Sequence, residues 1–137
     1  MSVFTEAELE YLASASLIRL ATVGPDGQPH VVPVTFQYNP DEDAIDVGGV
    51  FFGETKKWRD ARQNPRVTLL LDESWGRGAK AIEIRGIAEA HETGGDRINP
   101  RFSNFRPEFL RIRPRRIVAW GVEPQGEGTF ATNARDV

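Results

Sequence analysis

The chain has 137 residues, which is enough for one domain with one hydrophobic core. Its net charge of −3 argues against general binding to nucleic acid or to anionic membranes, and the absence of cysteine excludes disulfides, thiol catalysis and thiolate metal ligands. The acidic start lacks a signal-peptide pattern, and no apolar run is long enough to span a bilayer. We therefore expect a single cytoplasmic domain, residues 1–137, with neither nucleic acid nor a membrane as partner.

Hydrophobic periodicity and turn signals predict a mainly β protein with six strands and two or three short helices. Thr5 and Glu8 have the spacing of a capping box, which predicts that a first helix starts there. The first connections are too short for crossovers, so we expect antiparallel strands, and closure into a barrel would remove the edges of such a sheet. The predicted strands cover residues 16–24, 30–38, 45–50, 66–72, 79–92 and 116–122, and a second helix covers about 54–63.

Three segments depart from a regular strand pattern. Pro33 cannot donate a hydrogen bond to a ladder, so it belongs at an edge or a bulge. Gly86 interrupts the alternation of Ile82 and Ile84, which indicates a β-bulge. The tail, residues 124–137, is polar and rich in glycine, and we expect it to be disordered or ordered by a partner.

The sequence offers little for catalysis by side chains or metals. The two histidines, His30 and His91, fall on different predicted strands without a cysteine to supplement them, so no metal site is predicted. Ser74 has no recognisable base partner. Tyr38 is able to donate a proton, but a tyrosine in such a strand is more often structural. We therefore predict no catalytic residue.

The first of two basic segments, residues 53–67, contains five Lys or Arg residues against two acids and follows a Gly-rich strand end. Free N–H groups at a helix start bind anions, and here Thr55 would add a hydroxyl and Lys56 and Lys57 two charges. The alternative is a solvated helix whose basic side chains point outward. Spacing alone does not decide between these two interpretations.

The second basic segment runs from Arg97 to Arg116 and contains seven arginines against one acid, Glu108. Its interleaved aromatic residues are Phe102, Phe105 and Phe109. One interpretation is a surface for phosphates or nucleic acid. The acidic character of the whole chain favours the other, a solvated loop and strand edge whose phenylalanines pack into the core. Some of the arginines would still be available to an anionic cofactor tail.

Six segments, taken in order, resemble the pyridoxamine 5'-phosphate oxidase-like split β-barrel superfamily. They are FTEAELEYL, RLATVGPDGQPHVVPVTFQY, IDVGG, TKKWRDARQNPRV, IEIRGIAEA and RIRPRRIVAWGVE. Within this superfamily they are similar to the deazaflavin (coenzyme F-420)-dependent branch, and to its small reductases grouped with dehydrotetracycline reductase. The resemblance covers nearly the whole chain, and its strength lies in the order and spacing of the segments.

The resemblance implies a six-stranded antiparallel, FMN-binding-like split barrel that forms a homodimer with cofactor sites at the subunit interface. It assigns the cofactor phosphate to Lys57, with Thr55 and Lys56 beside it. Asp60 departs from many relatives, and we expect it to point away from the phosphate or to pair with Arg59 or Arg62. The residues implied at the cofactor ring are Val32, Pro33, Val34, Gly48, Gly49 and Val50, and those implied in a C-terminal segment folded over the cofactor are Asn133 and Arg135.

The function implied is an F-420-dependent oxidoreductase that transfers a hydride between the deazaflavin and a small organic substrate. F-420 carries an acidic tail that FMN lacks, and the arginines from Arg97 to Arg116, or Arg135, would meet it. Two alternatives remain: an FMN-binding protein or oxidase of the same fold, and a non-enzymatic F-420 carrier or sequestering protein.

Overall fold

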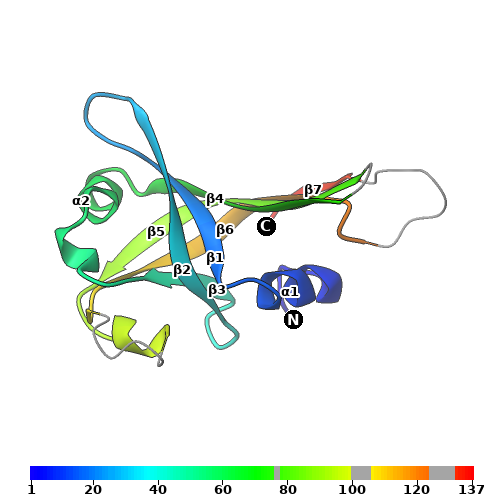
Figure 1. Cartoon of the computed structure of the whole chain (residues 1–137), viewed down its shortest axis with the longest axis horizontal. Coiled ribbons are helices and arrows are strands. Elements are labelled where there is room, and N and C mark those ends of the chain that lie inside the picture. Colours follow the sequence, from blue (N-terminus) through cyan, green and yellow to red (C-terminus); the bar gives the residue numbers. More distant parts are fainter. Residues whose placement is uncertain (76–77, 100–105, 124–131) are drawn as a thin grey trace.

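The computed structural model describes residues 1–75, 78–99, 106–123 and 132–137, and in these residues the protein is built mainly from strands (Figure 1). Two α-helices and two short 3-10 helices accompany them. The elements are α1 (Glu6–Ala13), β1 (Leu17–Val23), β2 (Pro29–Asn39), β3 (Ala44–Gly48), η1 (Phe52–Glu54), α2 (Lys56–Gln63), β4 (Arg66–Trp75), β5 (Gly78–His91), η2 (Gly95–Arg97), β6 (Phe109–Trp120) and β7 (Thr132–Asp136).

All strand pairs are antiparallel, and six of the strands close into a barrel. The sheet order is β3-β2-β1-β4-β5-β6-β7, and an additional pairing of β3 with β6 joins the two sides. This closing ladder is short, with register pairs from Ile45 with Ile112 to Val47 with Leu110. The predicted fold class, a mainly β protein with a six-stranded antiparallel barrel, is confirmed.

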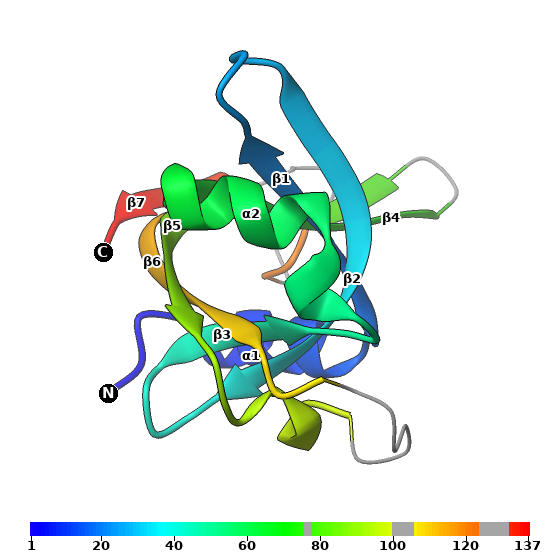
Figure 2. The same ribbon diagram turned by 90° about the vertical axis from the view of Figure 1, so that its left-hand side faces the viewer.

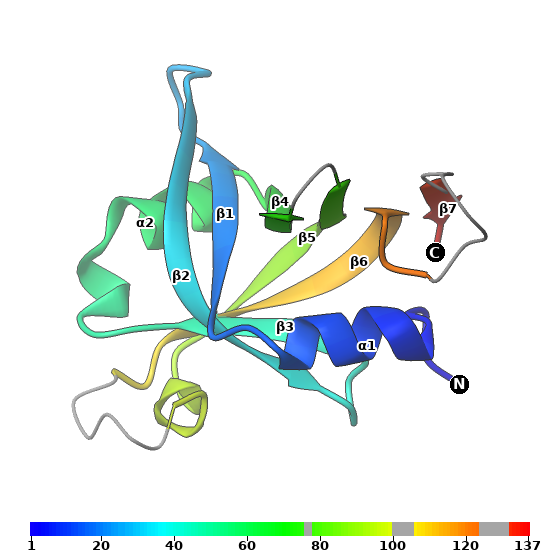
Figure 3. The same ribbon diagram turned by 45° about the vertical axis from the view of Figure 1, so that its right-hand side comes forward.

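The barrel interior is filled by aliphatic side chains that alternate along the strands, as the period of two in a strand requires. Fully buried examples are Leu20, Ile45, Leu69, Ile84 and Ile117. The two α-helices lie at opposite ends of the barrel (Figure 1 and Figure 3). Helix α2 packs against β1 and β5 through Trp58 and Ala61, which are both buried.

Several local predictions are confirmed. Thr5 and Glu8 form the reciprocal capping box at the start of α1. The register of the β5–β6 ladder shifts between Arg85 and Gly86, which is the expected bulge. A Cβ at Gly86 would lie 2.5 Å from the carbonyl oxygen of Arg113, so the close approach of the two strands requires glycine there.

Two predictions about the C-terminal third were wrong. Strand β6 begins at Phe109, well before the predicted start at Arg116. Its first half alternates arginines with Leu110 and Ile112, which is a strand pattern, but Pro114 interrupts it. The tail also contains a seventh strand, β7, which pairs with β6 of the same chain from Asp136 with Arg116 to Thr132 with Trp120. For residues 132–136, the expectation of disorder or ordering by a partner is therefore replaced by a strand; residues 124–131 lie outside the described residues.

Candidate functional site

The barrel is split along one edge of β2. The β2–β3 ladder ends at Thr35 paired with Gly48, whereas β1 continues alongside β2 to Pro29. Among the described residues, the outer half of β2 therefore pairs on one side only. The chain leaves β3 at Gly48 and passes through η1 into α2, which lies across the end of the barrel (Figure 2). The open edge of β2 and the start of α2 thus bound the same region.

The residues expected at the cofactor ring differ in exposure. Val34 is only 4% exposed and packs in the core, and a Cβ at Gly48 would lie 2.8 Å from Cδ1 of Ile98. At Val34 and Gly48, a ligand would therefore contact mainly backbone atoms. Pro33 and Val50 are exposed, whereas Val32 and Gly49 are half-buried. Pro33 lies on the stretch of β2 that pairs with β1 alone, which agrees with its expected position at an edge.

A hollow of about 440 Å³ lies on the outer face of β1, β2 and β4. It is lined by Leu17, Ile18, Arg19, Val31, Val32, Pro33, Leu70, Leu71 and Asp72. Leu17 and Val31 are 54% and 58% exposed, which is high for large apolar side chains. Two of the expected ring residues, Val32 and Pro33, therefore border an apolar surface that is uncovered in the single chain.

The start of α2 is capped by Thr55. Its side-chain oxygen accepts a hydrogen bond from the N–H of Trp58, and its hydroxyl donates to the carbonyl of Phe52 at 2.7 Å. This cap leaves the N–H groups of Lys56 and Lys57 without an intrahelical acceptor, as at any helix start. Thr55 shapes the turn within the chain. Because its hydroxyl already donates a hydrogen bond to the carbonyl of Phe52, it has no hydrogen left to donate to a ligand.

Lys57 is the cation best placed for an anionic ligand. Its side chain is half-buried, and burial lowers the pKa of its ammonium group. The ammonium nitrogen lies 5.4 Å from the centre of the Phe52 ring. Within the described part of the chain, no carboxylate forms an ion pair with it. A partly desolvated cation without a counter-charge favours the binding of an anion.

Lys56 differs, because its charge is already neutralised. Its ammonium nitrogen lies 2.6 Å from the carboxylate of Asp60, which is 5% exposed. The pair packs on Gly24, where a Cβ would lie 3.0 Å from the Asp60 carboxylate and 3.1 Å from Lys56 Nζ. Asp60 was expected to point away from the phosphate or to pair with Arg59 or Arg62; its partner is Lys56, so the pairing with either arginine was wrong. The i,i+4 spacing of Lys56 and Asp60 provided the signal for this pair.

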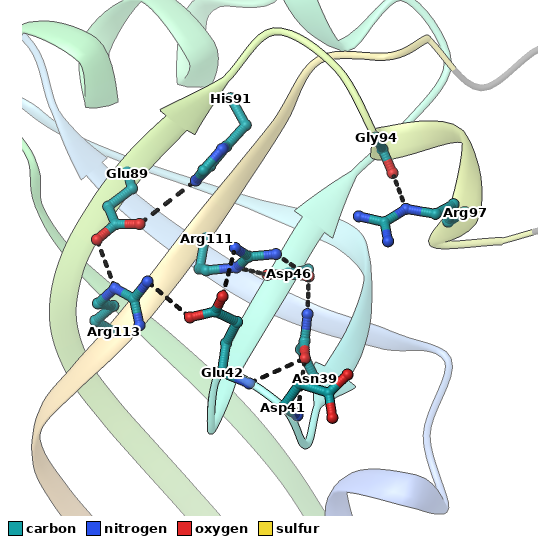
Figure 4. A network of polar contacts seen from close by, with 10 residues as sticks. All are labelled: Asn39, Asp41, Glu42, Asp46, Glu89, His91, Gly94, Arg97, Arg111 and Arg113. Atoms are coloured by element: carbon teal, nitrogen blue, oxygen red, sulfur yellow. Dashed lines mark hydrogen bonds and ion pairs between the residues drawn. The ribbon is translucent and has the colours of Figure 1, made fainter.

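Three of the six described arginines of the second basic segment are paired with carboxylates from elsewhere in the chain, and Figure 4 shows two of them, Arg111 and Arg113. Arg111 Nε lies 2.9 Å from the buried carboxylate of Asp46. Arg113 binds Glu89 and lies 3.0 Å from Glu42, which also approaches Arg111. Arg116 pairs with Asp136. These contacts support the structural interpretation of the segment.

Other residues of this segment are placed differently. Phe109 is buried, as the structural interpretation requires. Arg97, Arg106 and Arg115 form no ion pair with a described carboxylate. Arg97 donates to the carbonyl of Gly94, Arg106 lies over the ring of Phe51, and Arg115 is exposed. Arg101, Phe102 and Phe105 lie outside the described residues.

The C-terminal candidates Asn133 and Arg135 lie on β7. The Arg135 guanidinium lies 2.6 Å from the fully buried carboxylate of Glu8 in α1, and it also donates to the carbonyl of Val3. Because α1 and α2 are at opposite ends of the barrel, Arg135 is remote from Lys57 within one chain (Figure 1). A role for these two residues at the cofactor therefore requires a second subunit.

The polar residues considered for chemistry are engaged elsewhere or isolated. Tyr38 donates a hydrogen bond to Asp43 at 2.7 Å, and burial raises the pKa of its hydroxyl. His91 lies 3.4 Å from Glu89 and stacks on Phe109, and His30 lies apart on β2. In the described ranges, no three His, Asp or Glu side chains converge as metal ligands, and no helix is long and apolar enough to cross a membrane.

Sequence reasoning missed two residues beside the turn into α2. Phe51 has a left-handed backbone, with φ of 55°, although it is not glycine, and its side chain is 50% exposed. The carboxylate of Glu108 packs against Gly53, where a Cβ would lie 2.8 Å from its Cδ, and its Oε2 is buried without a hydrogen-bond partner. Neither feature leaves a local signal in the sequence, because each depends on how two distant segments cross.

Comparison with known proteins agrees with this architecture. The family model described as pyridoxamine 5'-phosphate oxidase matches residues 4–121. The 5a,11a-dehydrotetracycline/5a,11a-dehydrooxytetracycline reductase of Streptomyces rimosus subsp. rimosus is 38% identical over 137 residues, which cover 98% of this chain and 93% of that reductase.

Solved structures share the fold at lower identity. A conserved hypothetical protein of Mycobacterium tuberculosis superimposes with a TM-score of 0.67 at 22% identity, covering 93% of this chain and 94% of that one. A FAD-binding protein of Mesorhizobium loti superimposes with a TM-score of 0.60 at 24% identity, covering 83% and 92%.

Proposed function

Because the chain belongs to the pyridoxamine 5'-phosphate oxidase family, we propose that it is an oxidoreductase that binds a flavin-like cofactor, and specifically a coenzyme F-420-dependent reductase. The observation that carries this proposal is the half-buried ammonium of Lys57, which has no carboxylate partner among the described residues and lies at the start of α2. A reductase 38% identical to this chain supports the direction of the reaction.

The residues at the split edge fit such a cofactor. Lys57 and the free N–H groups at the start of α2 would bind the phosphate. Thr55 would shape the turn, and Lys56 would stay paired with Asp60. The ring would lie along the open edge of β2, against the main chain from Val32 to Val34 and from Gly48 to Val50. When bound, a reduced deazaflavin supplies the hydride.

The contribution of the protein is then to bind and orient the cofactor and the substrate, and to exclude water from them. Tyr38 was the candidate proton donor in the sequence, but its hydroxyl already donates a hydrogen bond to Asp43. The proposed mechanism therefore assigns the matching proton to solvent and makes no single side chain indispensable to the chemical step.

We also propose a homodimer. The hollow on β1, β2 and β4, with Leu17 and Val31 exposed, is an apolar surface of the kind that subunits bury. A second subunit is further needed for Asn133 and Arg135 to reach a cofactor bound at Lys57. In a dimer of two equivalent barrels, the two cofactor sites would be related by symmetry.

The preference for F-420 over FMN rests on its acidic tail. With Arg111, Arg113, Arg116 and Arg135 paired to carboxylates of their own chain, the exposed arginines of the second basic segment that form no ion pair among the described residues are Arg97, Arg106 and Arg115. Arg97 on η2 is our candidate for such a tail. The alternative function is an FMN-binding protein or oxidase, and the FAD-binding protein of the same fold supports it. A non-enzymatic F-420 carrier is the third candidate, because it would use the same phosphate contacts.

The decisive experiment is titration of the purified protein with F-420 and with FMN, followed by cofactor fluorescence. We expect F-420 to bind more tightly than FMN. The F-420 complex is then reduced and mixed with 5a,11a-dehydrotetracycline in a single turnover. A protein that binds FMN and not F-420 would contradict the cofactor assignment, and tight F-420 binding without hydride transfer to any electron-poor acceptor would favour a carrier.

A further inference from the structure

Phe51 is held in an unfavourable conformation without any gain in burial. Its backbone has φ of 55° and ψ of 29°, a region that residues with a Cβ rarely occupy. Its ring is 50% exposed, so core packing does not explain the residue. Strained, exposed residues of this kind cluster at ligand sites, where the surrounding structure holds them in place.

Arg106 is placed over this ring by contacts of the main chain. Its N–H donates to the carbonyl of Gly49 at 3.4 Å, which ties the segment to the end of β3. Its guanidinium carbon lies 5.0 Å from the centre of the Phe51 ring, within the range of a cation–π contact. Two residues later, the Glu108 carboxylate packs on Gly53. The fold therefore builds an exposed pair of one aromatic ring and one cation.

The position of this pair relates it to the proposed function. Phe51 follows Gly49 and Val50, which bound the proposed ring site, and precedes Thr55 and Lys57 at the proposed phosphate site. A ligand that enters beside the cofactor ring would meet Phe51 and Arg106 together. An aromatic face favours stacking with a flat ring system, and a guanidinium without a described carboxylate partner favours a delocalised anion.

We propose that Phe51 and Arg106 bind the substrate, and that this substrate is a planar, anionic ring compound carrying a carboxylate, enolate or phenolate. The inference rests on the proposed function, because it takes the cofactor to lie between β2 and the start of α2. Phe51 contributes the stacking surface and Arg106 contributes selectivity for the negative charge.

The test uses full-length protein loaded with the oxidised cofactor that it binds, and calorimetric titration with anthraquinone-2-carboxylate and its neutral carboxamide. We expect the carboxylate to bind at least tenfold more tightly than the carboxamide. Arg106→Gln should remove this difference, and Phe51→Gly should weaken both ligands about tenfold. The matched control is Arg85→Gln, which removes an exposed arginine of β5 paired with Glu83 and should change neither affinity.

Three further measurements make the outcome decisive. Phe51→Gly should leave cofactor affinity within twofold, leave the oligomeric state unchanged and keep or raise Tm, because glycine relieves the left-handed backbone. A lower Tm, a shifted dimer equilibrium or an equal loss of cofactor affinity would each overturn the proposal. So would a cofactor-loaded wild type that binds neither anthraquinone.

A wild type that binds neither F-420 nor FMN would contradict the proposed function, and this result is separate from the test of the Phe51–Arg106 site. Titration of that cofactor-free protein with the same two anthraquinones still tests the Phe51–Arg106 site. Loss of carboxylate binding in Phe51→Gly and Arg106→Gln would support the site alone, and unchanged or absent binding would overturn it.

Discussion

The two basic segments of this chain have similar compositions but different electrostatic environments. In residues 97–116, Arg111, Arg113 and Arg116 are all paired with carboxylates of the same chain. In residues 53–67, Lys56 is paired and Lys57 is not, within the described residues. The excess of positive charge in a segment is therefore a poor predictor of anion binding. The number of cations without a paired carboxylate is a better one.

The difference follows from secondary structure. Strand β6 runs beside β3 and β5, which place Asp46 and Glu89 on either side of Arg111 in register, and Glu89 binds the diagonal neighbour Arg113. Cross-strand pairs of this kind form between residues far apart in the sequence. In a short helix a lysine finds a partner mainly at i±3 or i±4. Lys57 has Glu54 at i−3 and Asp60 at i+3, but Asp60 pairs with Lys56, and among the described residues no ion pair joins Lys57 to Glu54.

The largest expected effect is in the arginine network. Asp46→Ala removes the carboxylate that lies 2.9 Å from Arg111 Nε and leaves that guanidinium buried with only the more distant Glu42. Removal of one partner from a buried ion pair lowers the free energy of unfolding by about 3–5 kcal/mol, and urea unfolding measures it. The control is Asp136→Ala, whose carboxylate is exposed and pairs with Arg116; it should cost less than about 1 kcal/mol. Equal costs for the two variants would contradict a structural role specific to the buried pair.

The second effect is on ligand binding. Lys57→Ala removes a charge-assisted hydrogen bond of about 1.5–3 kcal/mol, so cofactor affinity should fall by roughly ten- to a hundredfold. The free energy of unfolding should change little, because Lys57 has no ion pair with a described residue to lose. Fluorescence titration measures the affinity, and Arg59→Ala on the exposed face of α2 is the control. An unchanged affinity would show that Lys57 does not bind the phosphate, and would leave the N–H groups at the start of α2 as the main phosphate contact.

The third effect separates two neighbouring lysines. Lys56→Met leaves the buried carboxylate of Asp60 without its partner, which should lower the free energy of unfolding by about 1–2 kcal/mol. Cofactor affinity should change by less than about threefold, the reverse of the result for Lys57. The double variant Lys56→Met with Asp60→Leu should recover part of the stability. A large loss of affinity in Lys56→Met would show that Lys56 leaves Asp60 to bind the cofactor.

Local signals in the sequence were enough for much of the fold. The capping box at Thr5 and Glu8, the bulge at Gly86 and the six barrel strands depend on neighbouring residues and on a period of two. The whole of β7 was not predictable in this way, because its pairing with β6 depends on residues remote in sequence. At the start of β6, arginines alternate with Leu110 and Ile112, which is a local strand pattern that Pro114 interrupts.

The candidate site shows the same limit. The cluster of cations at the start of α2 was visible in the sequence, as was the turn that leads into it. The sequence did not reveal that Val34 points into the core or that Phe51 adopts a left-handed backbone. Each of these depends on tertiary packing, and each changes which atoms are available to a ligand.

The smallest expected effect is a pH dependence that belongs to Lys57 alone. Burial lowers the pKa of Lys57, so the folded, ligand-free protein loses this proton at a lower pH than the unfolded chain does. Between these two pKa values, the unfolded state binds more protons, and the free energy of unfolding should rise with pH. Binding of a phosphate requires the charged lysine, so cofactor affinity should fall across the same interval.

The contributions of Lys57 to stability and to affinity are therefore expected to change in opposite directions as the pH rises, and the comparison with Lys57→Arg separates them from the titration of Tyr11 and Tyr38, whose pKa values burial raises. Urea unfolding and cofactor titration at a series of pH values above 7 would measure both quantities on the same samples. Lys57→Arg keeps its charge throughout this range and should flatten both curves, and the titrations of the cofactor itself cancel in the comparison with wild type. A wild-type affinity that falls no more steeply than that of Lys57→Arg would show that the ammonium of Lys57 does not bind the cofactor. That result would leave the N–H groups at the start of α2 as the main phosphate contact.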